Sequence, residues 1–360
     1  MKTKSIVVLH FNVIEKYPPV LNFLRDFNSQ RPEFKIYVFT TYNNSKYSNF
    51  KTFGSSIYRF GIISFNFLFR YLTFLFYNGL SFFCLLLFRP EIILVYETFS
   101  VFPAFIYSKV YKKTIIHLHF HEYVSLSEKK SSSLYMKFLF YCEQCLLKVA
   151  SCSHTNDDRK FLQLRDYPGI NSSSVLVFPY FPPYYWWENY GIYKKKYESG
   201  CLKLLYIGSL DSETMYLEQI LSLVKSHPFE VSLTLFCPSI SATTKNILEL
   251  YKSSNISLNE VLDYDILPSV LIQFDVGLVL YKGHIPNYVF NVPNKVYEYL
   301  SCGLHILVDR SLITSTKLGF QQVLSVNFMS LDLEVIKSHV LNVPTEKPDY
   351  SSFKSLVTEL

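Results

Sequence analysis

Short apolar runs of strand length alternate with helical patterns twice along this chain, once before residue 155 and again after residue 201. Parallel strands need a long crossover connection, so this alternation is typical of parallel sheets joined by helices. In the first half we expect strands at 5–10, 34–39, 92–96, 114–120 and 150–154. In the second half we expect strands at 202–208, 231–236, 256–261, 276–280, 304–308 and 323–326.

A different pattern separates the two halves. The segment 175–187 carries three prolines and several aromatic residues, shows no sustained periodicity, and is followed by Lys194–Lys196. Prolines stiffen a chain and interrupt regular structure, so we interpret this segment as a domain linker. A chain of 360 residues is also long for one core and suits two domains of ordinary size. We therefore predict an α/β protein with domains at 1–182 and 201–349 and a linker at 183–200.

The amino-acid composition limits the cellular compartments and the classes of partner that we expect. Hydrophobic residues make up 49% of the chain and aromatic residues 18%, and the formal charge is +6. A basic, aromatic-rich chain favours an anionic partner, either a membrane surface or a phosphate-bearing substrate. No basic recognition helix is present, so we expect no nucleic-acid partner. The seven cysteines are scattered, which argues against a disulfide framework and for a cytoplasmic protein.

The segment 65–88 is almost wholly apolar and long enough to span a membrane. It is followed at once by Arg89-Pro90-Glu91 and an expected strand, and a span would put two parts of one sheet on opposite sides of a bilayer. We therefore prefer a buried or membrane-grazing helix. The aromatic residues Tyr184–Trp187 and the lysines Lys194–Lys196 are expected to join it in a peripheral contact with an anionic membrane. The apolar stretch at 5–10 is too short for a signal peptide.

The segment 291–308 reads as a loop, a short helix, a glycine stop and a buried strand. Val296 and Leu300 are four residues apart and share the face expected to pack on the sheet, whereas Lys295 and Glu298 share another. The N-terminus of this helix offers free N–H groups to a diphosphate. An ordinary αβ unit with a solvated Glu298 is the alternative.

This loop, helix, glycine and strand resemble the C-terminal domain of GT-B glycosyltransferases of the family 4-like group. The resemblance implies two Rossmann-like domains facing across a cleft, with the last residues, about 350–360, returning to the first domain as a helix. It also implies that a nucleotide-diphosphate sugar binds the second domain, with Glu298 at the ribose and Asn294 and Lys295 at the diphosphate. Metal-independent transfer, without a cofactor and with retention of configuration, is expected, and the acceptor is a glycan or a polyprenyl-linked glycan.

The sequence departs from this family at two places. After the first strand of the second domain, Gly208 could let backbone approach a phosphate, but Ser209 stands where relatives carry an arginine, and the following lysine is also missing. Lys282 and Lys295 are the available replacements. Phe290 stands where many relatives have a second glutamate. These departures leave two alternatives open: a GT-B nucleotide-sugar epimerase, and a catalytically inactive binding partner.

Three alternating histidines, His117, His119 and His121, lie at the end of an expected strand of the first domain. The outer two are separated by about 13 Å in an extended strand, too far to share one metal ion, so we expect no metal site. His121 and Glu122 lie where similar glycosyltransferases place a histidine beside the transferred sugar. Because the ordinary pKa of histidine is near 6.5, His121 suits hydrogen bonding to the sugar or proton removal from the acceptor. Glu97, at the end of the expected strand 92–96, is a weaker candidate for an acid or base in the reaction.

Overall fold

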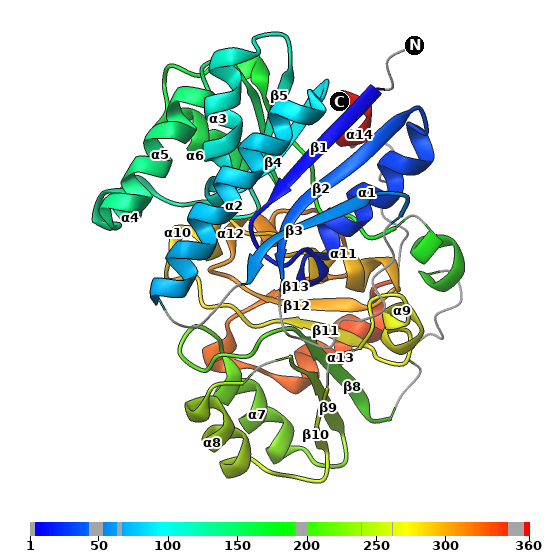
Figure 1. Cartoon of the computed structure of the whole chain (residues 1–360). Helices are drawn as coiled ribbons and strands as arrows, with labels where there is room; N and C mark the ends of the chain where they lie inside the picture. Colours follow the sequence, from blue (N-terminus) through cyan, green and yellow to red (C-terminus); the bar gives the residue numbers. More distant parts are fainter. Residues whose placement is uncertain are drawn as a thin grey trace. The chain divides into compact units, whose positions relative to one another are not determined.

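The computed structural model describes residues 4–42, 53–62, 67–183, 185–191, 197, 200–238, 240–260, 262–344 and 356–360. The chain divides into two compact units, one formed by Met1–Pro179 with Phe353–Leu360 and the other by Tyr180–Ser352. Each unit is a parallel sheet with helices packed on both faces (Figure 1). The expected α/β fold with two Rossmann-like domains is confirmed.

Unit 1 contains a seven-stranded sheet in the order β3-β2-β1-β4-β5-β6-β7. Its strands are β1 Lys4–His10, β2 Phe34–Tyr42, β3 Ser56–Ile62, β4 Ile92–Tyr96, β5 Ile115–His119, β6 Ser151–His154 and β7 Val175–Val177. Its helices are α1 Pro18–Gln30, α2 Phe67–Phe88, α3 Val101–Val110, α4 Leu126–Ser131, α5 Leu134–Leu146, α6 Asp157–Asp166 and α14 Leu356–Glu359. The terminal helix α14 contacts α1, so the end of the chain returns to the first unit.

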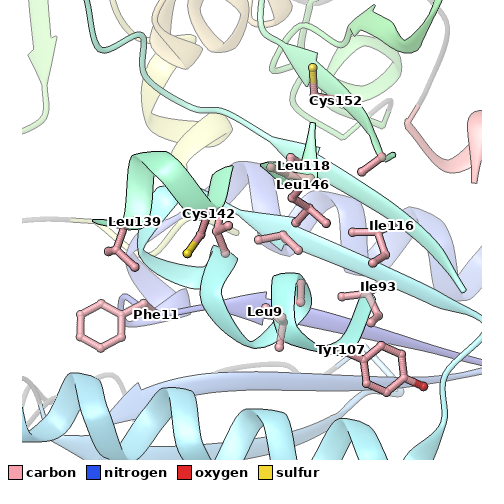
Figure 2. Packing of buried hydrophobic residues seen from close by; sticks show 14 of the residues in the cluster. Leu9, Phe11, Ile93, Tyr107, Ile116, Leu118, Leu139, Cys142, Leu146 and Cys152 are labelled. Atoms are coloured by element: carbon pink, nitrogen blue, oxygen red, sulfur yellow. The ribbon is translucent and has the colours of Figure 1, made fainter. Parts of the chain in front are cut away.

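Alternation along the strands divides the core of unit 1 between the two faces of its sheet. On β1, Val7 and Leu9 pack with α2, α3 and α5, and Figure 2 shows part of this cluster around Leu9, Ile93 and Leu118. Ile6 and Val8 point to the opposite face, where α1 and α14 cover them. Successive side chains of a strand point to opposite faces, so continuous apolar runs are what a sheet covered on both faces requires.

Unit 2 contains a six-stranded sheet in the order β10-β9-β8-β11-β12-β13. Its strands are β8 Leu202–Ile207, β9 Val231–Phe236, β10 Ile256–Asn259, β11 Val276–Val279, β12 His305–Asp309 and β13 Val323–Val326. Its helices are α7 Leu217–Ser226, α8 Ala242–Leu250, α9 Leu267–Leu271, α10 Pro286–Val289, α11 Asn294–Ser301, α12 Ile313–Thr316 and α13 Leu333–Asn342. As expected, Val296 and Leu300 of α11 are buried against the sheet.

Two parts of the expected linker are in fact ordered structure. Val175–Val177 forms β7 and pairs with β6 in parallel, because its apolar residues complete the edge of the first sheet. Trp186 and Trp187 are buried in the core of unit 2 beside α11. The expectation that these tryptophans face a membrane is therefore wrong. Tyr184 and Lys194–Lys196 lie outside the described residues.

Within the described ranges, one segment, Phe69–Phe88 in α2, is long and apolar enough to cross a bilayer by length and composition. Only 28% of its most apolar part is buried in the structure. Of the two expected arrangements, a buried helix and a membrane-grazing helix, the structure excludes a fully buried helix, because the outer side of α2 is exposed.

Gly277 in β11 allows α11 to pack closely on the sheet. A Cβ atom at this position would lie 2.2 Å from the Cδ2 atom of Tyr299, far inside van der Waals contact. Tyr299 is fully buried, and its hydroxyl accepts a hydrogen bond from the backbone N–H of Ile207 at 3.2 Å. Because Gly277 has no side chain, α11 can pack close to β11, and this position sets the distance between the helix and the strand.

We predict that Gly277→Ala lowers the free energy of unfolding by about 1–3 kcal/mol, because the added methyl group must displace the Tyr299 ring. Urea unfolding followed by tryptophan fluorescence measures this change. Gly79→Ala is a matched control, since a Cβ atom there meets nothing within 4 Å and alanine favours a helix. An unfolding midpoint for Gly277→Ala equal to that of the parent would contradict the packing argument.

Candidate functional site

In each sheet, the order in which successive strands are added reverses at one point. In unit 1 the reversal lies between β1 and β4, and in unit 2 it lies between β8 and β11. In open α/β sheets, ligands bind beyond the carboxyl ends of the strands at such a point. The described structure places candidate residues there in each unit.

In unit 2, the amino group of Lys295 lies at the carboxyl ends of β8 and β11. Its Nζ atom is 4.2 Å from the ring centroid of Tyr206 and 5.2 Å from that of Tyr281. A side chain at Gly208, the residue after β8, would meet this Nζ atom at 3.2 Å. Lys295 is only 6% exposed, and burial lowers its pKa to about 8, although the nearby Glu298 carboxylate acts in the opposite direction. Lys295 is thus a buried cation held over two aromatic rings.

Glu298 follows Lys295 by three residues on α11 and is 5% exposed. Its Oε1 atom accepts a hydrogen bond from Nδ2 of Asn294 at 2.8 Å. Burial raises the pKa of Glu298 to about 7, while hydrogen bonds from Asn294 and Tyr264 and the charge of Lys295 favour the ionised form. The solvated Glu298 of the alternative interpretation is therefore wrong. A buried acid and a buried base, both with their pKa moved toward neutrality, are typical of functional sites.

The other predicted residues of the second domain differ in their placement. Gly208 has a φ of +133°, which side-chain-bearing residues rarely adopt, so the turn after β8 favours glycine. Ser209 is exposed, and its carbonyl oxygen accepts a hydrogen bond from the Tyr206 hydroxyl at 2.7 Å. Lys282 donates from Nζ to the carbonyl oxygens of Ser212 and Glu213 at 3.2 and 2.9 Å.

The structure therefore brings four of the predicted residues together: Gly208, Asn294, Lys295 and Glu298. Among the contacts of the described residues, none joins Lys282 to this group. The hydrogen bonds of Lys282 instead hold the loop that follows Gly208, so Lys282 stabilises the backbone near Lys295 without contacting it.

In unit 1, the ring of His121 lies at the carboxyl ends of β1, β4 and β5. It stacks on Tyr96 at a centroid distance of 5.1 Å and meets His119 edge-on at 5.3 Å. Tyr17 and His10 lie 5.6 and 6.2 Å away. Burial, followed by repulsion from His119 and His10, holds the pKa of His121 well below its usual value. The imidazole is therefore neutral at physiological pH and able to accept a hydrogen bond, although the lowered pKa makes it a weaker base than a solvated histidine.

The side chains of Glu97 and Arg159 hold the backbone of His121 in place. Oε1 of Glu97 accepts hydrogen bonds from the N–H groups of His121 and, at 3.3 Å, of Glu122. Nη1 of Arg159 donates to the carbonyl oxygen of His121 at 2.6 Å. Glu97 has a φ of +62°, a strained value for a residue with a side chain, and burial followed by the nearby Glu122 raises its pKa to about 8. Strain of this kind persists where the surrounding structure enforces it.

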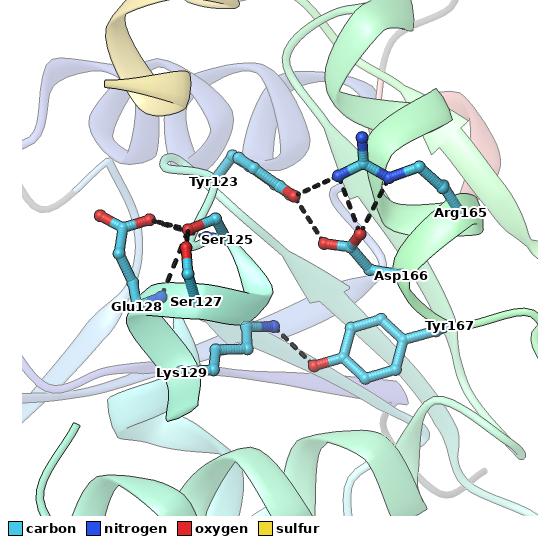
Figure 3. Close-up of polar contacts among 8 residues, drawn as sticks. All are labelled: Tyr123, Ser125, Ser127, Glu128, Lys129, Arg165, Asp166 and Tyr167. Atoms are coloured by element: carbon cyan, nitrogen blue, oxygen red, sulfur yellow. Dashed lines mark hydrogen bonds and ion pairs between the residues drawn. The ribbon is translucent and has the colours of Figure 1, made fainter. Parts of the chain in front are cut away.

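The loop after His121 is anchored to α6 (Figure 3). The hydroxyl of Tyr123 donates to Oδ2 of Asp166 at 2.5 Å and accepts from Nη2 of Arg165 at 3.3 Å. Nζ of Lys129 donates to the Tyr167 hydroxyl at 2.6 Å. A small cavity, with room for about one water molecule, lies between this loop and β4. It is lined by Glu97, Thr98, Phe120, Glu122, Tyr123, Val124, Lys129, Glu143, His154 and Gln163.

His117 and His119 are held by serine hydroxyls of β6. The two ring nitrogens of His117 lie 2.7 Å from the Oγ atoms of Ser151 and Ser153, and Nδ1 of His119 lies 2.7 Å from the same Ser153 Oγ. These bonds satisfy buried imidazoles and support a packing role. Within the described ranges, no group of three or more histidine, cysteine or acidic side chains is placed to hold a metal ion.

The sequence pattern missed several residues of these sites. Tyr206 and Tyr281 surround Lys295, yet in the sequence they are ordinary aromatic residues at the ends of apolar strands. Arg159 is almost fully buried, although arginine on a polar helix is normally exposed. Only their position could have indicated Tyr206 and Tyr281, because both lie at the carboxyl ends of adjacent strands, where ligands bind in such sheets.

No family model matches this sequence, and no curated protein matches it closely. Many solved structures do match. Sucrose-phosphate synthase from Thermosynechococcus elongatus is 11% identical, with a TM-score of 0.64 over 91% of this chain and 86% of that one. An α,α-trehalose-phosphate synthase (UDP-forming) from Burkholderia vietnamiensis is 14% identical, with a TM-score of 0.63 over 92% and 87%. A protein assigned as a UDP-N-acetylglucosamine 2-epimerase from Listeria monocytogenes is 13% identical, with a TM-score of 0.60 over 97% and 93%.

The chain has the GT-B fold. Identities of 10–15% among these matches establish the fold and nothing finer. Within the GT-B fold, the resemblance to the family 4-like group stays a prediction carried by the residues of α11 and the glycine and strand that follow.

We predict that Glu298 makes stability depend on pH. Its pKa is about 7 in the folded protein and near 4.5 when unfolded, so the folded state binds more protons in this interval. The contribution of Glu298 is therefore fully present below about pH 4.5 and is lost as the pH rises through 7, by up to about 3 kcal/mol. Glu298→Gln is the control, because its amide does not titrate. Urea unfolding should show the parent losing stability relative to this variant from pH 5 to 7, and a constant difference would contradict the prediction.

Proposed function

We propose that the protein is a glycosyltransferase that moves a sugar from a nucleotide-diphosphate sugar to a glycan or polyprenyl-linked glycan acceptor. One observation carries the proposal: the buried Lys295 lies beside Gly208 at the strand-order reversal of a GT-B sheet, and the buried Glu298 follows it by three residues on the same helix. A buried cation suits a diphosphate, and a buried carboxylate suits the two hydroxyl groups of a ribose. The comparisons support the nucleotide-sugar chemistry, because the matched structures include a UDP-forming trehalose-phosphate synthase and a protein assigned as a UDP-N-acetylglucosamine 2-epimerase.

Binding follows from the positions of these groups. The ribose hydroxyls donate to the Glu298 carboxylate, and the diphosphate meets Lys295 and the free N–H groups at the start of α11. Gly208 has no side chain to block the approach to the Lys295 amino group. Lys295 and these N–H groups would stabilise the leaving diphosphate, so we propose a transfer that needs no metal ion. Retention of the anomeric configuration is what the resemblance to the family 4-like group implies.

His121 is proposed to face the transferred sugar or the acceptor hydroxyl. Its neutral imidazole and its fixed backbone suit a hydrogen bond to either group. Glu122 is exposed beside it and is the second candidate for the same task. A lipid-linked acceptor in the synthesis of surface polysaccharide would place the protein in the cytoplasm, at the inner face of the membrane.

A GT-B epimerase is the second candidate function, favoured by the structural match to the protein from Listeria. An epimerase uses the same nucleotide-sugar site but needs no acceptor. A panel of nucleotide sugars, incubated with the protein with and without membrane lipid extract, separates the two. Transfer to lipid or hydrolysis of the donor supports the transferase, whereas interconversion of two sugars supports the epimerase. Neither reaction and no thermal stabilisation by any nucleotide would overturn both.

We predict that Glu298→Ala weakens binding of the nucleoside diphosphate by more than tenfold. Charge-assisted hydrogen bonds contribute about 1.5–3 kcal/mol each, and the alanine variant loses both. Glu298→Gln keeps the shape without the charge, so its affinity should lie between those of the parent and the alanine variant. Calorimetric titration, starting with UDP, measures the three affinities.

Glu249→Ala is the matched control for this comparison. Glu249 is also a helical glutamate of unit 2, but its side chain is 66% exposed. Its removal should leave nucleotide affinity unchanged. Equal affinity of the parent and Glu298→Ala would remove the main support for the proposed site.

We predict that His121→Ala lowers turnover by about 100-fold and leaves nucleotide affinity nearly unchanged, since His121 serves the acceptor side of the reaction. His119→Ala is the matched control, because its ring is bonded to Ser153 and should contribute less to the chemistry. Steady-state kinetics with calorimetry separates the two effects. Small and equal losses in the two variants would assign both rings to packing.

A further inference from the structure

One face of the sheet of unit 1 is covered by a layer of three helices, α2, α3 and α5 (Figure 1). α3 contacts both α2 and α5. Tyr135 of α5 also packs edge-on against Phe74 of α2 at 4.7 Å, and Phe102 of α3 lies 5.6 Å from Phe138 of α5. The three helices therefore share one continuous outer surface, here called the helical face.

The outer side of α2 is apolar. Phe76 and Phe83 are 56% and 57% exposed, and five more large hydrophobic side chains of α2 are exposed with them: Phe69, Tyr71, Leu72, Leu75 and Leu87. The inner side carries the buried polar residues Asn78 and Ser81. Phe74, Tyr77 and Leu85 are buried on the same inner side, so α2 is apolar inside as well as outside, and its outer side has few of the polar residues that a helix at the surface of a water-soluble protein carries. Leu134, Phe138 and Tyr141 of α5 extend the exposed apolar surface.

The charges on the helical face have one sign. The three helices contain four charged residues: Arg70, Lys109, Lys137 and Glu143. The first three are exposed cations, whereas Glu143 is buried and paired with Lys129 at 3.1 Å. The exposed lysines Lys112 and Lys113 follow the C-terminus of α3. Aromatic and aliphatic side chains among cations, with no exposed acid on these helices, match the interface of an anionic lipid bilayer.

We propose that the helical face docks on the surface of an anionic lipid bilayer, with α2 lying in the plane of the interface. The inner side of α2 explains why the helix lies flat. Tyr77 donates a hydrogen bond to the carbonyl oxygen of Phe39 at 3.3 Å, and Leu85 is fully buried in the sheet core. A span would remove both from the core and would leave only residues 89–91 to reach β4. The proposal is independent of the reaction proposed above.

Co-sedimentation of the full chain with vesicles tests the proposal. We expect binding to vesicles of phosphatidylglycerol and phosphatidylcholine at low salt, and much weaker binding to phosphatidylcholine alone. The double variant Phe76→Glu with Phe83→Glu should lower partitioning at least tenfold. Both side chains are exposed, so the variant should keep its fold. Phe229→Glu is the matched control, because Phe229 is 92% exposed in unit 2 and should not affect binding.

A second variant tests the charges. Lys109→Glu with Lys137→Glu should remove the preference for the anionic vesicles while keeping the apolar surface. Calorimetry with UDP on the phenylalanine double variant separates this proposal from the nucleotide site, since its affinity should equal that of the parent.

Three results would overturn the proposal. The parent could remain in the supernatant with anionic vesicles, or the phenylalanine double variant could sediment as the parent does. Light scattering could instead show a dimer that the double variant dissociates without a change in vesicle binding, which would assign the helical face to a second copy of the chain.

Discussion

The close packing of α11 on β11 is the constraint on which the site of unit 2 depends. The ring of Tyr299 fills the space that a side chain at Gly277 would occupy, and its hydroxyl bonds to the end of β8. One turn earlier on the same helix, Lys295 is carried to the carboxyl ends of β8 and β11, and Glu298 is buried beside Asn294. A shift of this helix would move Lys295 away from Gly208 and would displace Glu298 with it. The contact between Tyr299 and Gly277 therefore fixes both the packing of α11 and the positions of Lys295 and Glu298.

Burying Lys295 and Glu298 costs free energy, and their shifted pKa values record that cost. A lysine with its pKa lowered to about 8 and a glutamate with its pKa raised to about 7 are each less stable in the charged form than in water. The rings of Tyr206 and Tyr281 beside Lys295, and the amide of Asn294 bonded to Glu298, offset this free-energy cost only in part. A diphosphate near the lysine and hydroxyl donors near the glutamate would each favour the charged forms. The site is thus arranged to gain most from a ligand that carries both groups.

The sequence allowed the fold to be predicted because parallel sheets leave a strong pattern of alternating apolar runs. β4, β9 and β13 lie where the pattern predicts them, and α11 buries Val296 and Leu300 as their spacing requires. β7 was not predicted because its three residues precede a proline-rich segment and resemble a linker. β3 was missed because it is an edge strand in which no residue is fully buried. Tyr206 and Tyr281 could not be found because aromatic residues at strand ends are common in any core.

The same limit applies to α2, where the sequence argued against a membrane span but left a buried helix and a membrane-grazing helix open. A helix that is apolar on all sides satisfies both interpretations, since periodicity carries no information when every side is hydrophobic. The structure separates its two sides. Tyr77 and Leu85 face the sheet, and Phe76 and Phe83 do not. Neighbouring positions on one helix thus meet two different environments, and the apolar side chains of α2 lie on the outer surface as well as in the core.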